Sequence, residues 1–194
     1  MNSSPPSTRL RILDAACDLF YRLGYARVSV DMIAIASGFT KRTVYYHFES
    51  KDLIVATVLE VQHDQILRQI DGWGLEQAND AADICSQIFE KLAQWASQAG
   101  WTGSGFSRLT MELADLPGHP ARKTASNHKK TIEALLADRF SVVGAQNPDG
   151  LARRISTLIE GAMVLALIHR DVTYITDATQ AAIDWAKTNS RSTE

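Results

Sequence analysis

The chain has 194 residues, enough for one large domain or two small ones with a substantial hydrophobic core. Its hydrophobic fraction of 45% and charged fraction of 22% are those of an ordinary globular protein, which excludes a largely disordered or fibrous chain. The formal net charge of −2 excludes a global positive field, so any site for a polyanion must be local.

Positive charge is concentrated towards the N-terminus. Residues 1–52 contain seven Lys or Arg and five acidic residues, whereas the remainder contains thirteen Lys or Arg and seventeen acidic residues. Because the field at a surface depends on nearby charges, this basic N-terminal region matters more for binding than the total does.

The cysteines indicate a reducing cell interior, and the N-terminal segment does not resemble a secretion signal. Cys17 and Cys85 lie in apolar helical patterns without metal-ligand spacing, so we expect neither a disulfide nor a metal site. The first residues lack the apolar core of a signal peptide, and no apolar run is long enough to cross a bilayer. We therefore expect a cytoplasmic protein with no membrane partner and no cofactor.

Apolar residues recur at helical spacing along the chain, and no segment alternates as a strand would. We expect an all-α fold of about nine helices: a flexible lead-in at residues 1–7, a three-helix head at 8–52 and a helical bundle at 53–190. Ser7 or Thr8, Ser29, Thr40 and Ser50 are the expected N-caps. The predicted helices are 8–24, 30–36, 40–47, 50–70, 80–99, 105–116, 120–143, 148–170 and 176–188.

Residues 38–54, GFTKRTVYYHFESKDLI, combine a glycine turn with a cationic and aromatic helix. Two short helices joined by such a turn form a helix-turn-helix pattern. Val44 and Phe48 stand four residues apart and can pack inward, which leaves cations, hydroxyls and two adjacent tyrosines facing outward. A solvated face explains a single cation but not paired tyrosines, so the pattern favours a surface that binds a polyanion.

Residues 11–60 resemble the N-terminal DNA-binding domain of TetR-family transcriptional regulators. The resemblance rests on Ala-Ala and Leu-Phe in the first helix, on GYARVSV, and on IA…SGFTKRTVYYHFESKDLI. It implies binding of double-stranded operator DNA, with residues 40–43 at the exposed start of the recognition helix. The DNA-binding residues that it implies are Tyr25, Ser29, Thr40, Lys41, Arg42, Thr43, Tyr45, Tyr46, His47 and Lys51.

Three positions depart from the family pattern. Ser37 stands where a small alanine is usual, and Ile35 stands where a charged residue is frequent. Arg42 replaces a frequent glycine, and its long side chain can read guanine or reach a phosphate.

For the rest of the chain, the resemblance implies a homodimer formed by the last two long helices. The segment 151–169 supports this independently, because a helix that is apolar on more than one face is buried in a core or shared with a partner. Plain monomer core is the alternative. The candidate dimer-interface residues are Ile155, Leu158, Ile159, Ala162, Leu165, Ala166, Ala178, Ala182 and Trp185.

The resemblance also implies a small-molecule site enclosed by the middle helices. Ordinary core is the alternative for each aromatic candidate, and Glu112 can instead face water or pair with Arg108. The other histidines, at 63, 119, 128 and 169, lack metal spacing, and we expect surface or capping roles for them. The candidate ligand-binding residues are Phe89, Trp95, Trp101, Phe106, Met111, Glu112, His128 and Met163.

Taken together, the sequence predicts a homodimeric DNA-binding regulator that binds a pseudo-palindromic operator and acts as a repressor. An unknown small-molecule effector is expected to release it. No local arrangement of nucleophile, base or paired carboxylates predicts an enzyme. Two alternatives stay open: an all-α small-molecule-binding protein or enzyme with an unused helix-turn-helix head, and a regulator controlled by a partner protein.

Overall fold

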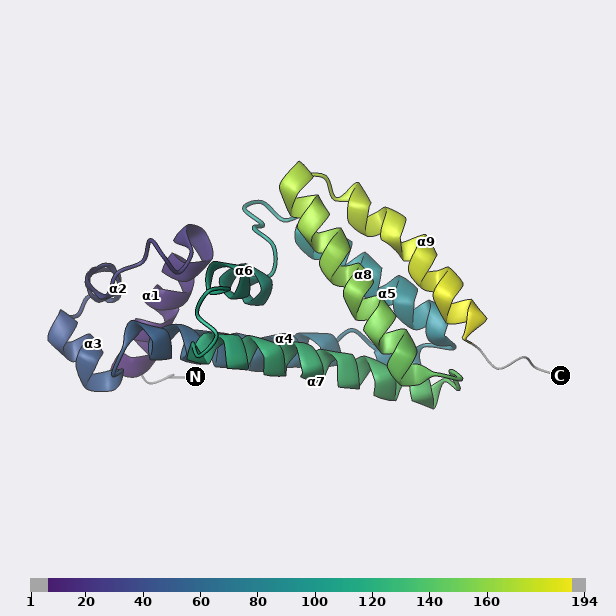
Figure 1. Ribbon diagram of the computed structural model, residues 1–194, viewed down its shortest axis with the longest axis horizontal. Coiled ribbons are helices and arrows are strands. Elements are labelled where there is room, and N and C mark those ends of the chain that lie inside the picture. Colours follow the sequence, from purple (N-terminus) through teal and green to yellow (C-terminus); the bar gives the residue numbers. More distant parts are fainter. Residues whose placement is uncertain (1–6, 190–194) are drawn as a thin grey trace, which may run out of the picture. The chain divides into compact units, whose positions relative to one another are not determined.

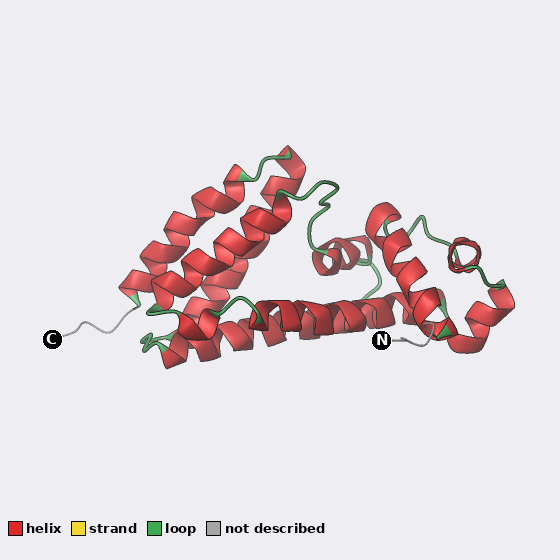
Figure 2. Cartoon of the chain, turned by 180° about the vertical axis from the view of Figure 1, so that it is seen from behind, coloured by secondary structure: helices red, strands yellow, loops and turns green. Residues whose placement is uncertain are grey.

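The computed structural model describes residues 7–189, which fold into α-helices joined by turns and loops (Figure 1). This range contains no β-strand, so the prediction of an all-α fold is confirmed (Figure 2). None of its helices is long and apolar enough to cross a bilayer. The predictions for residues 1–6 and 190 lie outside the described range. The helices are α1 (Thr8–Leu23), α2 (Val30–Ser37), α3 (Lys41–His47), α4 (Lys51–Asp71), α5 (Ala81–Ala96), α6 (Gly105–Glu112), α7 (Pro120–Val142), α8 (Pro148–His169) and α9 (Thr173–Thr188), with a 3-10 helix at Leu75–Gln77.

The chain divides into two compact units, and the first comprises residues 1–64 and 104–127. In its described part, α1 packs against α2 and α3, and apolar side chains at helical spacing form the core. This burial is what stabilises α2 and α3, because helices of seven or eight residues are not stable alone. The buried side chains of the first three helices include Ile12, Ala16, Phe20, Ile33 and Val44.

Side-chain caps fix where the N-terminal helices begin. Ser7 Oγ accepts a hydrogen bond from the backbone N–H of Leu10 (3.3 Å), and Ser29 Oγ accepts one from Met32 (3.2 Å). Thr40 Oγ1 caps α3 through Thr43 N (3.1 Å), and Ser50 Oγ caps α4 through Leu53 N (3.1 Å). The caps expected from the sequence are therefore present, with Ser7 rather than Thr8 at α1.

The turn between α2 and α3 depends on Gly38, which adopts the left-handed conformation (φ 76°, ψ 27°). Glycine ends a helix in this conformation at low energetic cost because it has no Cβ. Ser37, in place of the usual alanine, is buried, and its hydroxyl donates to the Ile33 carbonyl (2.7 Å). The guanidinium of Arg11 donates to the Ser37 carbonyl (3.0 Å) and stacks over the Phe39 ring. The Ser37 departure therefore leaves no polar group unsatisfied.

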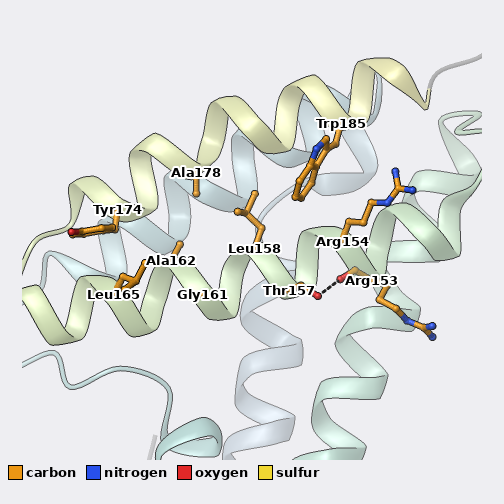
Figure 3. Close-up of a pocket in the computed structure, with 10 residues that line it drawn as sticks. All are labelled: Arg153, Arg154, Thr157, Leu158, Gly161, Ala162, Leu165, Tyr174, Ala178 and Trp185. Atoms are coloured by element: carbon orange, nitrogen blue, oxygen red, sulfur yellow. Dashed lines mark hydrogen bonds between the residues drawn. The ribbon is translucent and has the colours of Figure 1, made fainter.

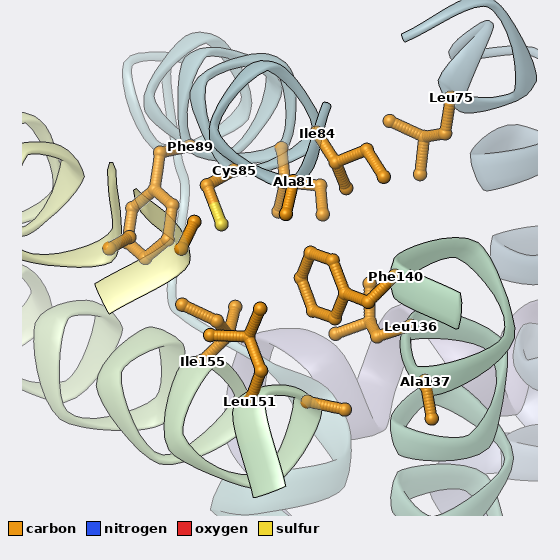
Figure 4. Close-up of a cluster of buried hydrophobic side chains, with 14 of the residues drawn as sticks. Leu75, Ala81, Ile84, Cys85, Phe89, Leu136, Ala137, Phe140, Leu151 and Ile155 are labelled. Atoms are coloured by element: carbon orange, nitrogen blue, oxygen red, sulfur yellow. The ribbon is translucent and has the colours of Figure 1, made fainter. Parts of the chain in front are cut away.

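The second unit comprises residues 65–103 and 128–194, of which 190–194 lie outside the described range. Within it, α5, α8 and α9 pack against one another (Figure 1). A continuous apolar core joins α5, α8, the C-terminal part of α7 and the 3-10 helix (Figure 4). Its largest fully buried side chains are Phe89, Phe140, Ile84, Leu151, Ile155 and Ile175.

Four local details differ from the sequence prediction. Helix α5 ends at Ala96 rather than 99. Helix α6 ends at Glu112 rather than 116, and a turn at residues 113–115 follows it before Pro117. Helix α9 begins at Thr173 rather than 176, because Asp171 Oδ1 accepts a hydrogen bond from Thr173 N (2.9 Å). The 3-10 helix was not predicted.

Candidate nucleic-acid interface

Helix α3 buries Val44, leaves Thr43 and His47 half-buried, and exposes its other four side chains. Val44 is fully buried, and Phe48 beyond the helix end is buried beside it. Tyr46 is 84% exposed and Tyr45 is 47% exposed. The Tyr46 ring meets the imidazole of His47 edge-on at a centroid distance of 5.1 Å. Because this seven-residue helix buries only one side chain, its outer face carries both polar and aromatic side chains.

The two cations at the start of α3 have different environments. Lys41 Nζ donates to Asp31 Oδ2 of α2 (2.9 Å), and this hydrogen bond and charge raise the pKa of Lys41. Arg42 is exposed, and its guanidinium has no hydrogen-bond or ion-pair partner in the described part of the chain. Of the two, only Arg42 keeps its full donor set for a ligand.

The turn between α1 and α2 is held from α4. Lys51 Nζ donates to the carbonyls of Tyr25 and Val28, both at 3.1 Å, and lies 3.8 Å from the centroid of the Tyr25 ring. Burial lowers the pKa of Lys51, partly offset by Asp52 and Glu112. The Tyr25 hydroxyl donates to Asp52 Oδ1 (2.5 Å). Tyr25 and Lys51, which the resemblance assigns to DNA, thus make contacts within the unit that hold the turn.

Helix α6 holds the same turn from another side. Glu112 Oε2 accepts a hydrogen bond from Ala26 N (3.1 Å), and Arg108 Nη1 donates to the Tyr21 carbonyl (3.0 Å) at the end of α1. Gly24 has φ 79° and ψ 171°, a conformation essentially restricted to glycine, and a Cβ there would lie 2.5 Å from Glu112 Oε1. The Glu112 carboxylate, predicted as a ligand contact, therefore binds the backbone of this turn.

His119 completes the contacts around Tyr25. Its Nδ1 accepts a hydrogen bond from Ala121 N (3.2 Å), which caps α7, and its Nε2 lies 3.5 Å from Asp52 Oδ1. The ring also meets Tyr25 edge-on at 5.2 Å. The capping role expected for a histidine is found at His119, whereas His128, for which a surface position or a capping role was expected, is buried inside α7.

Comparison with known proteins accounts for this arrangement. A sequence model described as "Bacterial regulatory proteins, tetR family" matches residues 12–58, which include α2, α3 and the turns at their ends. A solved structure of a putative TetR transcriptional regulator from Streptomyces avermitilis superposes with a TM-score of 0.81 at 27% identity, covering 94% of this chain and 99% of that one. The chain belongs to the TetR family of transcriptional regulators.

Two curated relatives show how the similarity to known regulators is distributed along the chain. The uncharacterized HTH-type transcriptional regulator YxaF of Bacillus subtilis is 24% identical over 174 residues, which is 88% of this chain and 91% of the relative. The HTH-type transcriptional regulator SrpR of Pseudomonas putida is 35% identical over 78 residues, but the match spans only 37% of its length. With the family match at residues 12–58, this chain is a DNA-binding transcriptional regulator of the TetR family, whose members are regulators rather than enzymes.

The predicted ligand-binding residues of this TetR-family regulator are divided between the two units. Three belong to the first unit and the others to the second. Phe89, Phe106 and Met163 are buried core residues, whereas Met111 is 62% exposed. Among the candidates, a cluster forms between Trp95 and Trp101, whose rings meet edge-on at 5.8 Å.

The predicted dimer residues separate into two groups. Ile155, Ala166 and Ala182 are fully or almost fully buried in the core of the second unit, and the partly buried Ile159 packs against that core. The other five line an open apolar groove of about 530 Å³ on α8 and α9 (Figure 3). They are Leu158, Ala162, Leu165, Ala178 and Trp185.

Proposed function

We propose that this TetR-family regulator binds a pseudo-palindromic operator as a homodimer and represses transcription until a small molecule releases it. The observation that carries the DNA-binding part is the outer face of α3, where Arg42 and Tyr46 stand exposed on a helix anchored by Val44. A helix of this kind enters the major groove with its N-terminal side chains at the base edges. In a bacterial cell, such an operator lies in the cytoplasm.

The groove on α8 and α9 supports a dimer. Gly161, Ala162 and Ala178 leave room for another helix to approach closely, while Leu165 and Trp185 are exposed apolar side chains at its edges (Figure 3). Exposed apolar surface of this kind is costly on a monomer and is typical of a protein interface. A second copy of the chain, placed there by a two-fold axis, would pair the same groove with itself and give two heads for two half-sites.

The Trp95–Trp101 pair supports a ligand site in the second unit. The Trp101 indole Nε1 is buried and has no hydrogen-bond partner among the described residues. A buried donor without an acceptor is costly, and an aromatic or heterocyclic ligand with an acceptor atom would satisfy it. Release from DNA requires that the ligand bind the DNA-incompetent state more tightly; a shift from 99:1 to 1:99 takes about 5.5 kcal/mol of differential binding.

Selection of bound fragments from the source genome tests the operator claim. The proposal predicts enrichment of sites with two similar, inverted half-sites whose centres lie about one helical turn or a multiple of it apart. Adding candidate small molecules to the best fragment and the protein would then identify an effector by loss of binding. Failure of any fragment to enrich over the input pool, with correctly folded protein, would contradict operator recognition.

A further inference from the structure

Most cations between residues 7 and 52 are already engaged within the protein. Arg27 and Arg42 are the exceptions: both are exposed, and neither guanidinium has a hydrogen-bond or ion-pair partner in this range or elsewhere among the described residues. Arg42 lies on the recognition helix, whereas Arg27 was not singled out by sequence. The engaged cations are Arg9 over the Phe48 ring, Arg11 at the Ser37 carbonyl, Arg22 with Asp18, Lys41 with Asp31, and Lys51 at the carbonyls of the turn.

The backbone around Arg27 is fixed from both sides. Lys51 binds the carbonyls of Tyr25 and Val28, one residue before and one after Ala26–Arg27. Glu112 binds the N–H of Ala26. These partners come from two different helices, so the turn has little conformational freedom. The Arg27 side chain therefore projects from a backbone that these contacts fix in place.

The burial pattern directs Arg27 outward. Val28 and Val30 are 2% and 8% exposed, while Arg27, Ser29 and Asp31 alternate with them on the exposed side. Asp31 in turn contacts Lys41, the first residue of α3 (2.9 Å). The exposed surface of the recognition helix therefore continues through the Asp31–Lys41 contact onto the start of α2 and the turn that carries Arg27.

We propose that Arg27 binds a backbone phosphate beside the groove that α3 enters, with Lys51 and Glu112 as the residues that position its turn. The role rests on the operator-binding function proposed above. A guanidinium offers several donors to a phosphate, and a backbone that is already ordered loses little further freedom on binding. Phosphate contacts fix the orientation of a recognition helix without reading sequence.

Three variants separate a phosphate contact from other roles. Arg27→Ala removes the charge, Arg27→Lys keeps it, and Arg22→Ala removes an exposed cation of α1 that is paired with Asp18. Each is titrated by fluorescence anisotropy against a labelled duplex obtained by the fragment selection and against a shuffled duplex, over about 50 to 200 mM salt. Thermal unfolding of each variant confirms that the fold is intact.

The slope of log K against log salt decides the outcome. Arg27→Ala is expected to reduce its magnitude by about 0.9 for each head bound, on both duplexes, while Arg27→Lys and Arg22→Ala keep the wild-type slope. An unchanged slope in Arg27→Ala would overturn the proposal, as would loss of discrimination between the two duplexes in Arg27→Lys, which would indicate base reading. A wild-type protein without salt-sensitive binding would instead overturn the operator-binding function, and the role of Arg27 with it.

Discussion

At the scale of single residues, the sequence predicts local contacts and misses distant ones. Ser29 and Thr40 cap helices whose N–H groups lie three residues away, and their positions follow from the sequence. The carboxylate of Glu112 meets Ala26, 86 residues away in the chain, and Lys51 meets Tyr25 across 26 residues. The spacing of apolar residues does not encode such pairs. The sequence therefore does not show that Tyr25 and Lys51 have partners within the protein.

The Gly24 turn gives a direct test of the contact with α6. Gly24→Ala is expected to destabilise the first unit by more than Gly38→Ala, because the Gly24 backbone conformation is essentially restricted to glycine and a Cβ there would lie 2.5 Å from Glu112 Oε1. At Gly38 the nearest atom is Nη2 of Arg11 at 3.2 Å, and a cost of about 1–2 kcal/mol is expected from the left-handed backbone. Urea unfolding measures both free energies; equal losses would contradict the larger cost expected at Gly24.

The two cysteines give a test of burial that depends on pH. Burial raises the pKa of Cys85 to about 12 and also raises that of Cys17, where the effect is reduced by a hydrogen bond from Gln62. At pH 8 the Cys85 thiol is then almost entirely neutral, and the thiolate is the reactive form.

Both thiols are therefore expected to react slowly with a disulfide reagent in the folded protein and rapidly after unfolding. Cys17→Ser and Cys85→Ser report the two rates separately, with Cys85 the slower. Because a raised pKa favours the neutral form, reactivity should increase as the pH is raised. Fast native-state reaction of Cys85 at pH 8 would contradict the buried environment.

At the scale of single elements, α3 shows why sequence could predict a DNA-binding helix. Its hydrophobic requirement is small: Val44 is fully buried, and Phe48 follows it after one turn. The remaining positions are not needed for packing, so their residue types reflect ligand binding rather than the requirements of the core. Helix α8 is different, because most of its apolar residues satisfy the core, and sequence alone could not separate Ile155 in the core from Leu165 at the groove.

Removing a side chain from the exposed face of α3 is expected to reduce DNA affinity without a loss of stability. Tyr46→Ala should weaken binding of the selected duplex by roughly 1–3 kcal/mol and leave thermal unfolding unchanged, because Tyr46 is 84% exposed. Met111→Ala serves as the control, since Met111 is an exposed apolar residue of the same unit on α6. Equal affinity of the two variants would remove Tyr46 from the interface.

At the scale of the whole molecule, the proposed function needs two copies of the chain. The groove of about 530 Å³ on α8 and α9 is lined mainly by apolar or small side chains, with Arg153 and Arg154 at one end (Figure 3). A dimer formed there would couple two recognition helices to one operator. Two linked binding events increase affinity far beyond that of a single head.

Placing a charge in the groove is expected to separate the copies. Leu165→Glu should convert a dimer to a monomer in sedimentation velocity and reduce operator affinity with it, because an unpaired carboxylate would be buried at the interface. Val142→Glu introduces the same charge at an apolar residue of α7 that is 80% exposed and outside the groove, and should leave the dimer intact. A dimeric Leu165→Glu protein would place the interface elsewhere.

The most direct test of the central claim is an anisotropy titration of the wild-type protein with the selected duplex and with its shuffled counterpart at several salt concentrations. The account predicts that log K falls linearly with log salt, by about 0.9 for each phosphate neutralised, and that the selected duplex binds at least about a thousandfold more tightly. Binding that ignores both salt and sequence would contradict it, because a helix-turn-helix head that reads an operator must show both.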